Sequence, residues 1–529
     1  MNYCAPTFFL LFLPLTALAY QLVPQRQRWM VLLVASYLFF WSISGKLLVH
    51  LLCSTVSMHH FGLWLDSVLR EQSEQLHDMP RRKRKRVRKR YAKRLRAIVG
   101  VGVCLQIGLL ILLKYTRFFS RNIGVLLRML DFPYHLPVHK FLVPIGLSFY
   151  TLQAVSYLFD IYRGTLKADD HLGRLALYMS FFPGLMEGPI CRYGETAQQL
   201  WAGNPITYHN LTFGVQRMLY GFFKKLVIAD RLNLLVVTVF DGYMDYDGGV
   251  IALGMVCYTC QLYMDFSGVM DIVIGCAEIF GVTLPENFRQ PFFSRSVSEF
   301  WRRWHITLGT WFRDYVFYPL SLSEPLKRLT KSARKKWGNH FGPLCASAVA
   351  LFCVWFCNGL WHGAAWCFLF FGFYHFTWIL TEQIVEPFAA SGLSRLHIRR
   401  EGGFWHVVQM IRTAVLINIG ELFFRAHGLS AGIIMFKKML TEWTLRSFRD
   451  GTVLNLGMDK LDYSVVVIMT SLVLAVSVLH ERGYSVRSRA ARLGVVPRWM
   501  LYYGLLLVVI LLGAYGMNYI PIDPMYAKY

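Results

Sequence analysis

Apolar segments of bilayer length recur along this chain from one end to the other. They lie near 5–23, 29–45, 47–65, 97–115, 141–161, 343–358, 361–386, 405–424, 462–480 and 499–518. A helix of about 20 apolar residues crosses the hydrocarbon core of a bilayer. Of the 529 residues, 55% are hydrophobic and only 16% are charged. The chain is therefore predicted to be an all-α, multi-pass integral membrane protein with about eleven transmembrane helices plus re-entrant or interfacial helices.

The net charge of +25 is unevenly distributed. Twelve of these charges fall within 81–96, a stretch without acidic residues between two apolar segments. This placement is typical of a cytoplasmic loop that contacts anionic membrane lipid, and it argues against nucleic-acid binding. Three predicted spans, 5–23, 29–45 and 47–65, precede this block, so the N-terminus is predicted to lie outside the plasma membrane.

Several polar or helix-breaking residues interrupt the apolar segments. Pro144 and Gly146 open the stretch that carries Gln153, and 181–193 holds two prolines and two glycines, which predicts a re-entrant or cavity-lining backbone. Asp265 lies within a long apolar run and is expected to face a cavity or a partner. Four charges, Lys224, Lys225, Asp230 and Arg231, either snorkel to the interface or form the mouth of a donor site.

Two motifs each place one histidine among tryptophans. The first reads Ser296-Val-Ser-Glu-Phe-Trp-Arg-Arg-Trp304-His305-Ile-Thr-Leu-Gly-Thr-Trp-Phe-Arg-Asp-Tyr315, and the second reads Trp355-Phe-Cys-Asn358-Gly-Leu-Trp361-His362-Gly-Ala-Ala-Trp366. Ser296 and Glu299 form a capping box that predicts a helix from Val297. Its arginines predict an amphipathic helix over 296–315 that does not cross the bilayer. In the second motif, Trp355, Gly359, His362 and Trp366 are predicted to share one helix face.

A buried histidine suits acyl transfer from a thioester to an alcohol. The reaction needs a base for the hydroxyl proton, donors for the oxyanion and exclusion of water. Desolvation keeps an imidazole unprotonated near neutral pH, and His362 fits this role. Asn358 lies one turn before His362 and is expected to orient the ring or to bind the carbonyl oxygen. A histidine that only packs two helices is the alternative.

Together the two motifs resemble the signature of the membrane-bound O-acyltransferase family, most closely its alginate O-acetyltransferase branch. The resemblance covers roughly 140–430, and it also rests on 141–161, on 181–193 and on Phe423-Phe-Arg-Ala-His-Gly-Leu-Ser430. It implies that His362 is the catalytic base and that His305 is a second polar group of the site. Candidate residues for the substrate path are Asn358, Trp361, Trp304, Asp265 and Gln153.

The resemblance also implies a single membrane domain over 1–529 with a central tunnel. N-terminal helices with a basic cytoplasmic loop (70–96) occupy 1–135, a catalytic core occupies 136–430, and a loop with the last two spans occupies 431–529. The expected substrates are a cytoplasmic acyl thioester, either acetyl-CoA or the phosphopantetheine of a carrier protein, and an exported or cell-wall polysaccharide. A separate extracytoplasmic SGNH-type acyltransferase is the expected partner. No permanently bound cofactor is expected.

Three other functions are considered. A D-alanyl transfer protein for teichoic acids is the alternative within the family. A polysaccharide transporter or flippase would use Asp160, Asp265, Asp271 and Glu278 as a coupling path, and an export scaffold would not need His362. The eleven cysteines show no zinc-ligand spacing, so no metal site is predicted.

Overall fold

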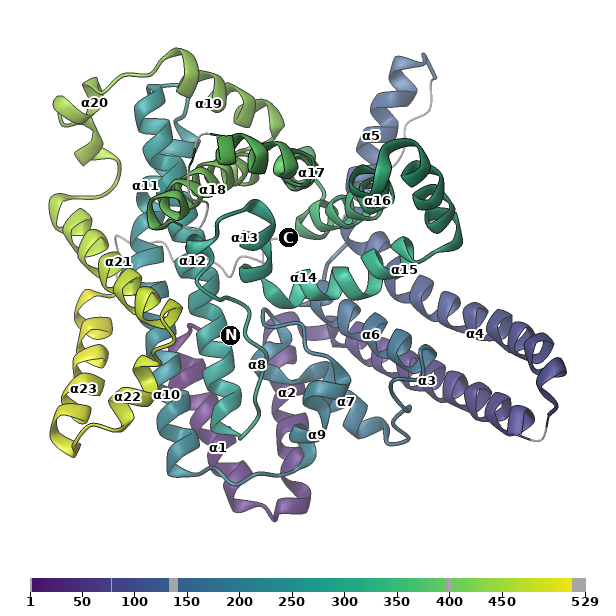
Figure 1. Ribbon diagram of the computed structural model, residues 1–529. Coiled ribbons are helices and arrows are strands. Elements are labelled where there is room, and N and C mark those ends of the chain that lie inside the picture. Colours follow the sequence, from purple (N-terminus) through teal and green to yellow (C-terminus); the bar gives the residue numbers. More distant parts are fainter. Residues whose placement is uncertain (1, 78, 133–140, 396, 398–401, 516–529) are drawn as a thin grey trace. The chain divides into compact units, whose positions relative to one another are not determined.

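The computed structural model describes residues 2–77, 79–132, 141–395, 397 and 402–515 (Figure 1). Within these ranges the chain forms helices and connecting segments without a β-strand, which confirms the all-α prediction. Six described helical segments are long and apolar enough to cross a membrane, as expected of a multi-pass protein. The total of about eleven spans stays a prediction, as does the central tunnel, and the predicted boundary near 135 lies outside the described residues.

The chain divides into two compact units. Among the described residues, the first comprises those up to Val215 together with Val273–Pro285, and the second comprises Gln216–Ile272 and Glu286 to Tyr515. Two helices, α10 (Tyr208–Phe222) and α12 (Gly248–Ile279), have residues in both. The further division into three regions stays a prediction.

The helices of the first unit are α1 (Leu13–Leu22), α2 (Arg28–Ser44), α3 (Leu48–His77), α4 (Arg81–Leu110), α5 (Thr116–Met129), α6 (Leu147–Tyr162), α7 (Leu172–Ser180), α8 (Phe182–Leu185) and α9 (Tyr193–Trp201). Here α3, α4 and α6 pack against one another. The basic block is the first half of α4, so the prediction of a loop there is wrong. Arginine and lysine are strong helix formers, and Pro80 precedes the first helical residue.

The irregular backbone of 181–193 agrees with its prolines and glycines. Only the four residues of α8 are helical between α7 and α9. Ser36 accepts a hydrogen bond from the Phe182 amide (3.0 Å), and the Tyr3 hydroxyl donates to the Phe182 carbonyl (2.8 Å). These bonds satisfy backbone groups that a regular helix would have paired internally.

In the second unit the helices are α11 (Asp230–Asp241), α13 (Val297–Arg303), α14 (Ile306–Phe312), α15 (Tyr318–Ser321), α16 (Glu324–His362), α17 (Trp366–Arg395), α18 (Gly403–Arg425), α19 (Leu429–Thr441), α20 (Arg446–Arg449), α21 (Lys460–Glu481), α22 (Val486–Ala491) and α23 (Val495–Leu512). A bend interrupts α16 at Gly338, where φ is 75°. The backbone folds back there, because a Cβ atom on Gly342 would lie 2.4 Å from the Cα of Arg334.

Buried ion pairs connect the π-helical segment Phe223–Ala229 to α12. Lys224 lies 2.6 Å from Asp271, and Lys225 lies 2.5 Å from Asp230 and 3.0 Å from Asp265. Both lysines are at most 4% exposed. They do not snorkel, because their ammonium groups are neutralised inside the protein. Removing one partner of such a pair is strongly destabilising.

Candidate active site

The first histidine motif forms two short helices with a break between them. Ser296 caps α13 and accepts a hydrogen bond from the Glu299 amide (3.0 Å), so the predicted helix start at Val297 is confirmed. The helix ends at Arg303, and His305 adopts a left-handed conformation with φ 45° and ψ 52°. The expectation of one continuous helix over 296–315 is therefore wrong.

Pairing with an earlier segment holds this break open. Phe288 and Trp304 form an antiparallel bridge. The Arg289 amide donates to the Arg303 carbonyl (2.9 Å), and the Ile306 amide donates to the Asn287 carbonyl (3.0 Å). These bonds replace helical hydrogen bonds across the break. They offset the strain of a non-glycine residue in the left-handed region.

His305 is 3% exposed and lies among aromatic side chains. Its ring centroid is 4.8 Å from Phe266 and 5.5 Å from Trp361. Nδ1 lies 3.2 Å from the side-chain oxygen of Asn287. Burial, and next the neighbouring His362, lower the pKa of His305 well below its ordinary value. His305 lies outside the six candidate spans, and its ring is neutral at physiological pH.

The second motif ends a long helix. His362 is the last residue of α16, and α17 begins at Trp366. Trp366 is 55% exposed and does not share a helix face with His362, which corrects the prediction. The chain turns at Gly363, where a Cβ atom would lie 2.4 Å from the Phe368 ring.

Close contact between α16 and α17 depends on two other glycines. A Cβ atom on Gly359 would lie 2.6 Å from the Phe368 carbonyl oxygen, and one on Gly372 would lie 2.4 Å from the Trp355 carbonyl oxygen. The two backbones therefore touch directly, as glycine allows. This contact places the end of α16 against the start of α17.

His362 is 7% exposed and is enclosed by rings from three helices. Its centroid is 5.0 Å from Trp361 and 5.0 Å from Phe424 of α18. Phe424 belongs to the Phe-Phe-Arg-Ala-His-Gly-Leu-Ser stretch, so a third motif reaches the same cluster. Asn358 lies one turn earlier on α16, and its buried oxygen has no hydrogen-bond partner among the described residues.

Trp361 lies between the two histidines, because its ring contacts both imidazoles. The sequence motifs thus converge on one aromatic cluster, although they are about fifty residues apart. Trp304 is buried beside Phe288 and Tyr263, with centroid distances of 5.0 and 6.0 Å. A shared cavity that reaches both faces of the membrane stays a prediction.

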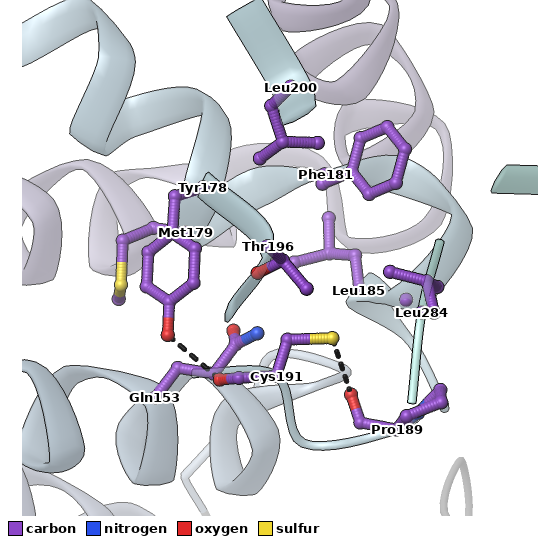
Figure 2. A pocket seen from close by; sticks show the side chains of 11 residues that line it. Gln153, Tyr178, Met179, Phe181, Leu185, Pro189, Cys191, Thr196, Leu200 and Leu284 are labelled. Carbon is purple, nitrogen blue, oxygen red and sulfur yellow. Dashed lines mark hydrogen bonds between the residues drawn. The ribbon is translucent and has the colours of Figure 1, made fainter. Parts of the chain in front are cut away.

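The two remaining candidates have other surroundings. Asp265 is ion-paired with Lys225, next to Phe266 of the cluster. Gln153 belongs to the first unit and lines a pocket of about 20 Å³, room for about one water molecule (Figure 2). In that pocket the Tyr178 hydroxyl donates to the Cys191 carbonyl (2.8 Å). A role for either residue in the substrate path stays a prediction.

Three polar residues near the cluster were not anticipated from the sequence. Asn287 binds His305 and follows Pro285 shortly before the first motif. His375 is fully buried, with its ring 4.8 Å from Trp301 and 5.4 Å from Trp355. Glu421 is 2% exposed and precedes Phe424 by almost one turn of α18. Only their position in apolar segments or beside a motif could have singled them out.

The chain is similar in sequence to known acyltransferases. The profile of a family described as membrane-bound O-acyltransferase matches residues 171–420, a range that contains both histidine motifs. A "Probable alginate O-acetylase" of Azotobacter vinelandii is 31% identical, over 88% of this chain and 84% of its own length. The peptidoglycan O-acetyltransferase of Helicobacter pylori is 28% identical over 64% of each chain. The teichoic acid D-alanyltransferase of Bacillus subtilis is 30% identical, over 46% of this chain and 59% of its own length.

Proposed function

Because this chain belongs to the membrane-bound O-acyltransferase family, we propose that it transfers an acetyl group from a cytoplasmic thioester toward the hydroxyl groups of an exported or cell-wall polysaccharide. Its place among multi-pass membrane acyltransferases follows from the family. The observation that carries the proposal is the convergence of His305 and His362 on Trp361 in a buried aromatic cluster. Because the family is one of acyltransferases, we propose this activity rather than that of a transporter, a flippase or an export scaffold.

His362 is proposed as the general base. As the acceptor oxygen attacks the thioester carbonyl, the neutral imidazole takes the hydroxyl proton. The tetrahedral intermediate collapses, the C–S bond breaks, and His362 returns the proton to the sulfur, which leaves as a free thiol. The aromatic rings around His362 exclude water, which limits hydrolysis of the thioester. The amide of Asn358 orients the ring or stabilises the oxyanion.

Acetyl is favoured over D-alanyl as the transferred group. The probable alginate O-acetylase is similar over 88% of this chain, whereas the D-alanyltransferase is similar over 46%. The donor is either acetyl-CoA or an acetylated carrier protein, because both present the same phosphopantetheine thioester. A separate SGNH-type enzyme outside the membrane is the expected partner in polysaccharide acetylation. It would either receive the acetyl group or act together with this protein.

Purified protein in lipid nanodiscs tests the function directly. We expect release of free thiol from acetyl-CoA or from acetylated carrier protein when polysaccharide fragments are present, and release slower by about 10²–10⁴-fold with His362→Ala protein. His60→Ala, the same change at an exposed histidine of α3 outside the proposed machinery, is the matched control. If the protein used only a D-alanylated carrier protein as donor, its activity would be D-alanyl transfer. Equal rates in wild-type and His362→Ala protein would contradict the mechanism.

We also propose that the basic half of α4 is cytoplasmic and that the N-terminus lies outside. The concentration of arginine and lysine in 81–96 supports this orientation. In a cysteine-depleted background, Lys85→Cys should react with an impermeant thiol reagent only after the cells are opened. Labelling of intact cells would reverse the topology.

A further inference from the structure

Asn287 is a buried amide held in place on both sides. It is 1% exposed. On one side, the Glu286 carboxylate accepts two hydrogen bonds from Arg217 (2.7 and 2.5 Å), and Arg217 also binds Asp271 (3.1 Å). On the other side, Phe288 forms the bridge with Trp304. The contacts of the two neighbouring residues thus fix the backbone around Asn287 independently of the Asn287 side chain.

The contacts of this side chain identify its oxygen. One terminal atom lies 3.1 Å from the Thr307 amide nitrogen and 2.9 Å from the Thr307 hydroxyl. A backbone N–H can only donate, so this atom must be the amide oxygen. The amide nitrogen then faces the sulfur of Met270 at 3.2 Å, where a donor is suitable. The reverse orientation would place two N–H groups against each other.

The same oxygen lies 3.2 Å from Nδ1 of His305. An amide oxygen accepts and cannot donate, so the imidazole nitrogen facing it must carry a hydrogen. We infer that Asn287 is a positioning residue that holds neutral His305 in the tautomer with its proton on Nδ1 and its lone pair on Nε2.

In this tautomer His305 has a defined role in acyl transfer. That role rests on the proposed function. Nε2 becomes a hydrogen-bond acceptor, suited to bind a neighbouring hydroxyl of the polysaccharide while His362 removes the proton from the reacting hydroxyl. The opposite tautomer would present an N–H donor at the same position. In serine proteases a carboxylate fixes the catalytic histidine by the same principle; here a neutral amide does so, which leaves the imidazole uncharged.

Nitrogen NMR of the full-length protein in lipid bilayers tests the tautomer without any activity. The chain has 16 histidines, so ¹⁵N-histidine labelling is combined with His305→Gln protein to identify the His305 signals. We expect a protonated Nδ1 and an unprotonated Nε2 in the wild type, and loss of this fixed state in Asn287→Leu. Thr307→Val removes one donor to the Asn287 oxygen but keeps the His305 bond, and it should retain the wild-type signals. A proton on Nε2 in the wild type, or wild-type signals in Asn287→Leu, would overturn the inference.

Kinetics then distinguish positioning from a structural role. Asn287→Leu should lower kcat about 10-fold with little change in KM. Asn287→Asp keeps the acceptor oxygens but places a carboxylate beside the ring, so the pKa of His305 should rise and the acid limb of the rate profile should move to higher pH. The other charged groups nearby are paired within the protein: Asp265 shares Lys225 with Asp230, Glu286 pairs with Arg217, and Arg303 pairs with Glu299. These groups and His362 are the same in wild-type and Asn287→Asp protein, so they do not account for a shift between the two profiles.

An unchanged pH profile in folded Asn287→Asp protein would contradict the inference. Size-exclusion profiles and melting temperatures establish that each variant is folded. If the wild type shows the expected tautomer but transfers no acyl group, the proposed function fails while the tautomer assignment stands. The two failures are therefore distinguishable.

Discussion

His305 and His362 reach the same aromatic cluster by different structural means. His362 ends one long helix, and its position follows from the packing of α16 against α17 through Gly359 and Gly372. His305 lies in a non-helical break, and its position follows from Asn287 and the segment around it. One histidine is set by the end of a helix, and the other by a contact between segments.

The two histidines are therefore held in position by two different kinds of contact. The end of a long helix is insensitive to any single side chain, because many backbone hydrogen bonds and packed glycines determine it. A residue with φ 45° depends on a few specific bonds that offset its strain. We therefore expect the position of His362, the proposed base, to tolerate changes around it, and the position of His305 to be sensitive to its neighbours.

The largest effect is expected at the end of the helix. His362→Ala should lower the rate of acyl transfer by about 10²–10⁴-fold, as loss of a general base typically does. Folding and membrane insertion should be retained, because α16 remains intact. Thiol release in nanodiscs measures the rate, and a near wild-type rate in folded protein would assign the proton transfer to another group.

A smaller effect on the rate is expected from substitution of His305, which lies in the break between α13 and α14. His305→Ala removes a hydrogen-bonding group that orients substrate, and loss of such a contact at about 1–3 kcal/mol lowers the rate about 5- to 150-fold. His305→Gln keeps an acceptor and should recover part of the loss. If His305→Ala were as severe as His362→Ala, the assignment of base and companion would have to be exchanged.

The contact between helices can be weakened without touching either histidine. A Cβ atom on Gly359 would lie 2.6 Å from the Phe368 carbonyl oxygen, and such overpacking typically destabilises by about 1–3 kcal/mol. Gly392→Ala is the matched control, because nothing lies within 4 Å of its Cβ position in α17. Thermal unfolding in detergent should separate the two variants, and equal melting temperatures would exclude the glycine contact as the determinant.

The smallest effect is expected at the start of α13. Ser296→Ala removes the N-cap, which typically contributes about 1 kcal/mol. Ser298→Ala, inside the same helix, keeps the cap and should be neutral. The loss should be partial because Glu382 also accepts hydrogen bonds from the Val297 and Ser298 amides (3.0 and 3.4 Å). A larger loss than for Gly359→Ala would show that the cap contributes more than the packing.

Features that depend on nearby residues could be predicted from the amino-acid pattern alone. The recurring apolar runs predicted an all-α membrane protein, and Ser296 with Glu299 predicted the helix start at Val297. Pro144 and Gly146 predicted a broken helix start in the stretch 141–161, and α6 begins only after Gly146, which has φ 79°. The two histidine motifs predicted the family. Capping, helix breaking and hydropathy act over a few residues, so their effects can be predicted from the order of residues in the chain.

The place where the first motif breaks, and the orientation of its histidine, depend on contacts between segments that are distant in the chain. The residues from Ser296 to Tyr315 have no proline, and their spacing suits one continuous helix. The break at Trp304 and His305 exists because Asn287, eighteen residues earlier, accepts the Thr307 amide hydrogen bond and the bridge at Phe288 replaces helical pairing. Likewise, Lys224 and Lys225 are buried rather than snorkelling because Asp265 and Asp271 on α12 neutralise them. These outcomes depend on partners distant in the chain, whose approach no local pattern specifies.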